Sequence, residues 1–73
     1  MTSQGRAMGR LMASPTVVRN ELVDARKKLD EVYEHIKRAI AYADDVTHSE
    51  LEDIRIRLAG LILDIDMIIE RMR

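Results

Sequence analysis

The chain has 73 residues, a net charge of −1 and no cysteine. The lack of cysteine excludes disulfides and thiolate metal sites, and the balanced charge excludes a strong basic field for nucleic acid. With 47% hydrophobic and 34% charged residues the composition is that of a folded chain, but one this short rarely supports a core by itself. Oligomerisation is therefore the remaining route to stability.

The N-terminal residues 1–14 are predicted to form a flexible arm. Met8, Leu11 and Met12 are spaced to give one short helical turn, and bases without acids are also typical of a targeting segment. No apolar run in the sequence approaches the roughly 18 residues that span a bilayer. We expect a soluble, cytoplasmic protein.

A first helix is predicted over residues 15–44. Ser14 provides an N-cap, and Pro15 suits the first helical position because its missing N–H has no helical partner there. Apolar residues then recur at alternating spacings of four and three, which is typical of a helix with one apolar face. This seam consists of Val18, Leu22, Ala25, Leu29, Val32, Ile36, Ala39 and Ala43.

A turn is predicted at residues 45–48 and a second helix at 49–72. Two overlapping S/T-x-x-E boxes, Thr47 with Glu50 and Ser49 with Glu52, indicate a helix start. So short a connection joins antiparallel neighbours. Residues 15–73 are therefore predicted to form an all-α, antiparallel two-helix hairpin.

The second helix carries two apolar rows on nearly opposite sides. The first row is Leu51, Ile54, Leu58, Leu61, Ile65, Ile68 and Met72. The second row is Ile56, Gly60, Leu63 and Met67, and a single hairpin is expected to leave it partly in water together with the flanking Ile62 and Ile69. Two hairpins would cover both rows by dimerising into a four-helix bundle. The predicted interface is Ile56, Gly60, Leu63, Met67, Ile62 and Ile69.

The function that this pattern favours is a small, non-enzymatic protein–protein interaction module: an adaptor, an inhibitor or an assembly factor. It would act as a homo-oligomer, a dimer first, or dock a helical segment of a protein partner on the second row. Two structural alternatives for that row are simple exposed aliphatic side chains and cover by the N-terminal arm.

A nucleic-acid-binding four-helix regulator is the alternative function. It would use the basic N-terminal arm and the basic side chains of the first helix, although acidic side chains lie between them. The bases in question are Arg26, Lys27, Lys28, Lys37 and Arg38.

A carboxylate and histidine metal site is a third hypothesis, resting on Glu31, Glu34 and His35 at helical spacing. These residues fall on polar positions, so a solvated face is the preferred interpretation. At the turn, Asp44, Asp45 and His48 could form only a weak metal site, and turn and capping chemistry is the preferred explanation of these residues. No phosphate loop or nucleophile with a base is present, so no enzymatic activity and no cofactor are expected.

Overall fold

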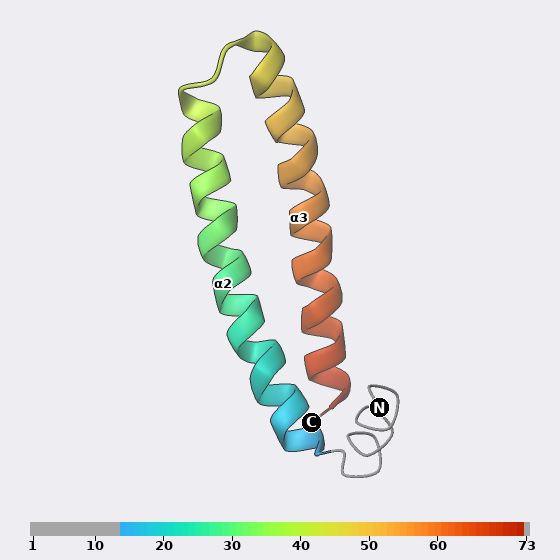
Figure 1. Ribbon diagram of the computed structural model, residues 1–73. Helices are drawn as coiled ribbons and strands as arrows, with labels where there is room; N and C mark the ends of the chain where they lie inside the picture. The colour runs from blue at the N-terminus through green and yellow to red at the C-terminus, as the bar shows by residue number, and fades with distance from the viewer. Residues whose placement is uncertain (1–13, 73) are drawn as a thin grey trace, which may run out of the picture.

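The computed structural model describes residues 14–72, in which the chain forms two antiparallel helices, α2 (Pro15–Ala41) and α3 (Asp45–Arg71). Each helix has 27 residues, a length of about 40 Å at about 1.5 Å per residue. The helices pack against each other with a short connection at one end (Figure 1). The predicted all-α helical hairpin is confirmed. The predicted helical turn at Met8, Leu11 and Met12 lies outside the described residues.

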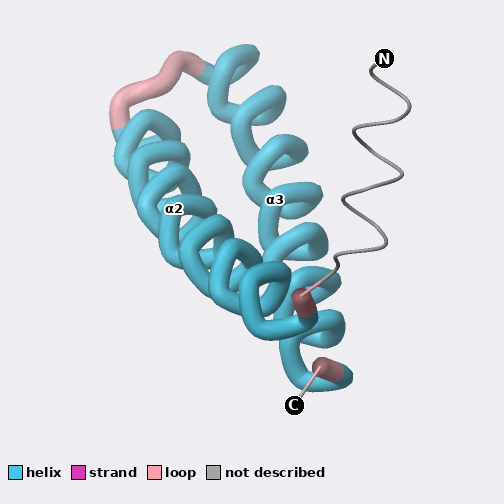
Figure 2. Tube along the Cα trace, turned by 60° about the horizontal axis from the view of Figure 1, so that its bottom comes forward, coloured by secondary structure: helices cyan, strands magenta, loops and turns pink. Residues whose placement is uncertain are grey.

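The start of α2 follows the predicted signals. The Ser14 side chain accepts a hydrogen bond from the backbone N–H of Val17 at 3.3 Å, and Pro15 occupies the first helical position. The end differs, because α2 stops at Ala41 rather than at residue 44. Figure 2 shows that the start of α2 and the end of α3 lie at the same end of the hairpin, opposite the connection.

The connection is residues 42–44, and α3 begins at Asp45 instead of residue 49. The cap is Asp44, whose Oδ1 accepts a hydrogen bond from the backbone N–H of Thr47 at 2.8 Å. That hydrogen bond lowers the pKa of the Asp44 carboxyl. Asp44 and Asp45 thus lie at the electropositive start of α3, where negative charge is favourable. The predicted turn at 45–48 is wrong because this aspartate caps the helix before Thr47 or Ser49.

The core of the hairpin is small. Among the described residues the buried apolar side chains are Leu58, Ile62 and Ile69, with exposed fractions of 9%, 8% and 9%. All three belong to α3, and α2 covers them with half-buried side chains such as Leu22 and Leu29. Three buried side chains are few for a domain, so the isolated hairpin has little apolar burial to stabilise it.

The side of α3 that faces α2 differs from the prediction. Ile62 and Ile69, expected partly in water, are buried, whereas Ile54 and Leu61 of the predicted seam are exposed by 41% and 56%. The reason is a rotation of α3 about its axis. The rotation brings Asp66 towards α2, where it pairs with Arg26.

Candidate functional site

The exposed apolar side chains of α3 form two groups on either side of its contact with α2. Ile62 and Ile69 mark the line of contact. At about 100° per residue, Ile54 and Leu61 lie on one side of that line and Leu63 on the opposite side. Each group is a separate candidate interaction surface.

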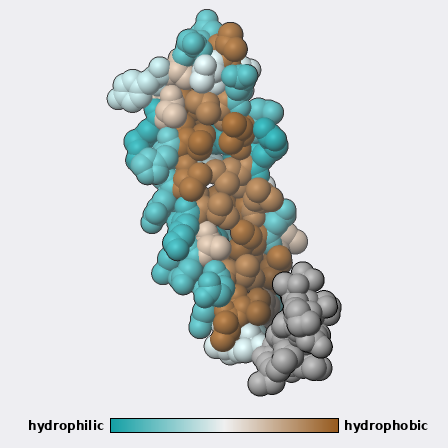
Figure 3. All heavy atoms as spheres, viewed as in Figure 1, coloured by the Kyte–Doolittle hydropathy of each residue, from teal (hydrophilic) through white to brown (hydrophobic). Residues whose placement is uncertain are grey.

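The first surface, which we call the two-helix face, extends over both helices. Ile54 and Leu61 lie on the same side of the hairpin as a flank of α2 that carries Val18 and Val32. These two valines are exposed by 47% and 45%. Figure 3 shows this face as a continuous apolar stripe along the hairpin, with polar side chains on both edges. Half-buried neighbours complete it: Ala25, Ile36, Ile65 and Ile68.

The second surface, which we call the α3 row, belongs to one helix. It consists of Ile56, Gly60, Leu63 and Met67, and its three side chains have exposed fractions of 61%, 63% and 69%. A shallow groove beside it is lined by Asp30, Tyr33, Ala59, Ile62 and Leu63. The structure therefore leaves the four central members of the predicted interface accessible, while Ile62 and Ile69 pack within the hairpin.

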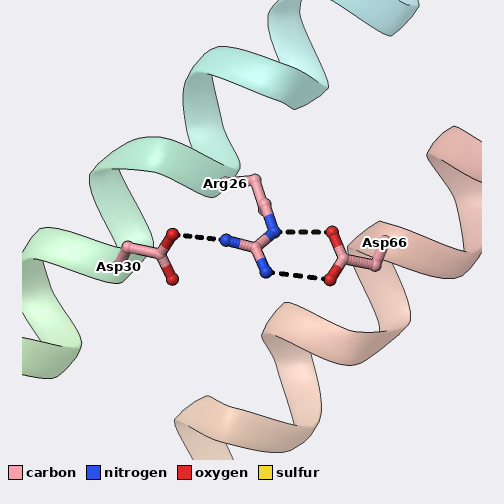
Figure 4. A network of polar contacts seen from close by, with 3 residues as sticks. All are labelled: Arg26, Asp30 and Asp66. Carbon is pink, nitrogen blue, oxygen red and sulfur yellow. Dashed lines mark hydrogen bonds and ion pairs between the residues drawn. The ribbon is translucent and has the colours of Figure 1, made fainter.

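A charged network joins the helices on the side away from the two-helix face (Figure 4). Arg26 donates from Nε to Asp66 Oδ1 at 2.6 Å and from Nη2 to Asp66 Oδ2 at 3.0 Å. The same guanidinium pairs with Asp30 one turn along α2. The hydrogen bonds from Arg26 hold the pKa of Asp66 below its ordinary value. This bidentate pair favours the observed rotation of α3 against α2.

A second polar contact lies nearer the connection. Arg55 donates to Tyr33 Oη across the helix interface at 2.9 Å and to Glu52 Oε1 in its own helix at 2.7 Å. Lys37 lies 5.7 Å from the centre of the Tyr33 ring. Together with Arg26 and Asp66, these groups give the hairpin one polar edge and leave the opposite edge apolar.

Asp66→Asn is expected to reduce the acid sensitivity of folding. Because the folded pKa of Asp66 is lowered, its pair with Arg26 stabilises the fold above about pH 4 and is lost as pH falls through the folded pKa. The variant should melt below wild type at pH 7, and the difference should narrow as the pH is lowered below about 4. Circular dichroism melts over this pH series measure the change. Salt should weaken the difference, because the two side chains are 34% and 36% exposed.

The matched control is Asp24→Asn, at an exposed aspartate of α2. It removes the same charge without touching the network and should shift both melts little. Equal acid sensitivity in wild type and Asp66→Asn would contradict the role given to the pair.

The bases proposed for nucleic acid point in different directions around α2. Arg26 faces α3 and is bound to Asp66, whereas Lys28, two positions on, lies on the outer side. Lys37 pairs with Glu34 at 3.6 Å, and Arg38 lies 3.3 Å from His35 Nδ1. The five bases therefore form no single basic face in the hairpin.

The residues proposed for metal binding line an open surface depression at Asp30, Glu31, Glu34, His35 and Arg38. Within residues 14–72, no group of three or more His, Asp or Glu side chains is arranged to hold a metal ion. At the connection, Asp44 instead binds the backbone of Thr47. The geometry gives these residues surface and capping roles.

No protein-family model, curated protein or solved structure matches the chain. Neither α2 nor α3 contains a stretch long and apolar enough to cross a membrane. The two apolar surfaces are the features of the described residues that indicate a function.

The sequence pattern predicted the α3 row as an exposed surface but assigned the residues of the two-helix face to the core of the hairpin. The apolar spacing predicts that Val18, Val32, Ile54 and Leu61 hold the hairpin together, whereas in the structure they line an exposed apolar face. The missed signal was the pair of opposite charges, Arg26 and Asp66, at seam-flanking positions of the two helices.

Proposed function

We propose that the chain is a non-enzymatic protein–protein interaction module, such as an adaptor, an inhibitor or an assembly factor, that acts as a self-associated helical hairpin. Two hairpins pack through their two-helix faces into a four-helix bundle. The observation that carries the proposal is the continuous apolar stripe over both helices (Figure 3). An isologous contact of this kind places the same residues in both halves of the interface.

The gain from covering this face can be compared with the cost of association. Covering a half-exposed Val, Ile or Leu is worth about 1 kcal/mol, roughly half the value of full burial. Val18, Val32, Ile54 and Leu61 contribute twice in a symmetric dimer, and their half-buried neighbours add to the sum. Association costs about 4–15 kcal/mol in lost freedom. The two terms are of similar size, so we expect a dimer whose formation depends on concentration.

Small residues on the same face permit close approach. Ala25 and Ala39 lie on the flank of α2 that carries Val18 and Val32. Facing helices pack at about 8–10 Å, and small side chains allow the shorter end of that range. The face therefore has large side chains to bury, and its alanine positions leave space for the large side chains of the partner.

Sedimentation equilibrium over a concentration series tests the proposal. The expected mass approaches twice the 8.4 kDa of one chain as concentration rises. Helicity measured on the same samples should fall on dilution, because the single hairpin buries few side chains. A fully helical chain with the mass of a monomer at every concentration would overturn the proposal.

A further inference from the structure

The α3 row lies outside the surface that the proposed bundle would use. Leu61 belongs to the two-helix face, whereas Leu63, two positions on, lies on the other side of the contact with α2. Pairing through the two-helix face therefore leaves Ile56, Leu63 and Met67 exposed. A contact other than the one that forms the bundle is needed to cover the row.

Gly60 in the middle of the row has no role inside the hairpin. A glycine within a helix destabilises it relative to alanine, and such a position usually reflects close approach of another backbone. A Cβ built on Gly60 meets nothing within 4 Å. Its missing side chain therefore makes room only for something outside residues 14–72, between Ile56 on one side and Leu63 and Met67 on the other.

The charges along one flank of the row are complementary to themselves in the antiparallel direction. In chain order they are Asp53, Arg57, Asp64 and Arg71, with alternating sign. Two copies of α3 crossing antiparallel near Gly60 place Arg57 opposite Asp64 of the second copy, and Asp53 opposite Arg71. A parallel two-fold crossing would instead set this flank against the other flank of the row, and the alternating charges would not meet each other. Arg57 and Asp53 also pair within the helix at 3.7 Å, but both are highly exposed and free to exchange partners.

The opposite flank of the row is acidic. It carries Glu52, Asp66 and Glu70, of which Glu52 is bound by Arg55 and Asp66 by Arg26 within the same chain. These carboxylates are therefore partly neutralised before any association. The first flank supplies the attraction between copies.

We propose that the α3 row docks the α3 row of a second copy, antiparallel and crossing at Gly60. This contact is independent of the two-helix face and would join bundles into larger assemblies. A four-residue row is short compared with an interface of about 800 Å² per partner. The contact should therefore be the weaker of the two and appear at higher protein concentration.

Disulfide trapping with Gly60→Cys tests the proposal, because the natural chain has no cysteine to interfere. Around a two-fold axis near Gly60, the two introduced thiols come within the Cα separation of about 4.4–6.8 Å that a disulfide needs. Under mild oxidation we expect covalent dimers to form at least tenfold faster than with Glu31→Cys, a control at an exposed position on the outer side of α2. Equal rates for the two variants would overturn the proposal and leave the row to a partner of another kind.

The charge pattern provides a second, reversible test in the Gly60→Cys background. Asp64→Arg places arginines opposite each other at two symmetric points and should slow trapping by about threefold to tenfold, as expected for exposed charge pairs. Adding Arg57→Asp restores opposite charges across the axis and should restore the rate. Unchanged trapping in the single variant would overturn the antiparallel arrangement.

The same trapping in a Leu61→Asp background separates this proposal from the proposed function. The mass of the Leu61→Asp variant reports on the two-helix face, while the disulfide at position 60 reports on the α3 row. Trapping should persist in this background as long as circular dichroism shows that the hairpin is helical. Its loss in a helical variant would overturn the independence of the two contacts.

Discussion

Leu61→Asp is expected to split the proposed dimer into single chains. Leu61 is the most exposed large side chain on the two-helix face, at 56%, and in the bundle it would face the same surface of the partner. An aspartate there would be buried without a partner for its charge, which costs several kcal/mol for each copy. Sedimentation equilibrium at a concentration where wild type is dimeric should give the mass of one chain.

Two matched variants make this experiment specific. Leu63→Asp introduces the same charge on the same helix at an exposed fraction of 63%, but on the α3 row, and should leave the dimer intact. Val17→Asp introduces the same charge on α2, at an exposed fraction of 57% and on the outer side of the first turn, where a negative charge is favourable. If Leu63→Asp splits the dimer and Leu61→Asp does not, the assignment of the two surfaces must be exchanged.

Ile62→Ala is expected to produce a large loss of stability in the hairpin. Ile62 is 8% exposed and lies on the line of contact between α2 and α3. Truncating a buried isoleucine to alanine costs about 2–5 kcal/mol, and a two-layer structure that can partly close the space favours the lower end. For a domain of this size, 2 kcal/mol corresponds to a fall in Tm of roughly 8–16 °C.

The neighbouring Leu63→Ala is the control for this prediction. It removes a similar volume from a side chain in water and should change Tm little. Thermal melts followed by circular dichroism should be compared at one protein concentration, because association also stabilises the fold. Equal losses from the two variants would contradict the packing direction of α3.

The sequence predicted the hairpin because its strongest signals are local. The Ser14 and Pro15 start signal and the four-three apolar spacing of α2 depend on residues within a few positions of each other, and both are found in the structure. The predicted position of the connection is wrong because three candidate N-caps, Asp44, Thr47 and Ser49, lie within six residues of one another. Sequence alone does not rank them, and the aspartate with the 2.8 Å hydrogen bond is the one used.

The rotation of α3 could not be predicted in the same way. An apolar stripe wide enough for two neighbours fits several rotations, and aliphatic side chains discriminate weakly among them. The orientation depends on contacts between residues 22 and 40 positions apart, Arg55 with Tyr33 and Arg26 with Asp66. These directional contacts favour the rotation in which Ile62 and Ile69 are buried and Ile54 remains on the surface.

The three-residue core of the hairpin has a consequence for the protein in a living cell. A chain that folds only on association with a second copy would be folded at high protein concentration and accessible to proteases at low concentration. Its level would then show a threshold, below which newly made molecules are degraded before they meet. The shortage of internal burial would in this way link the lifetime of the protein to its own synthesis rate.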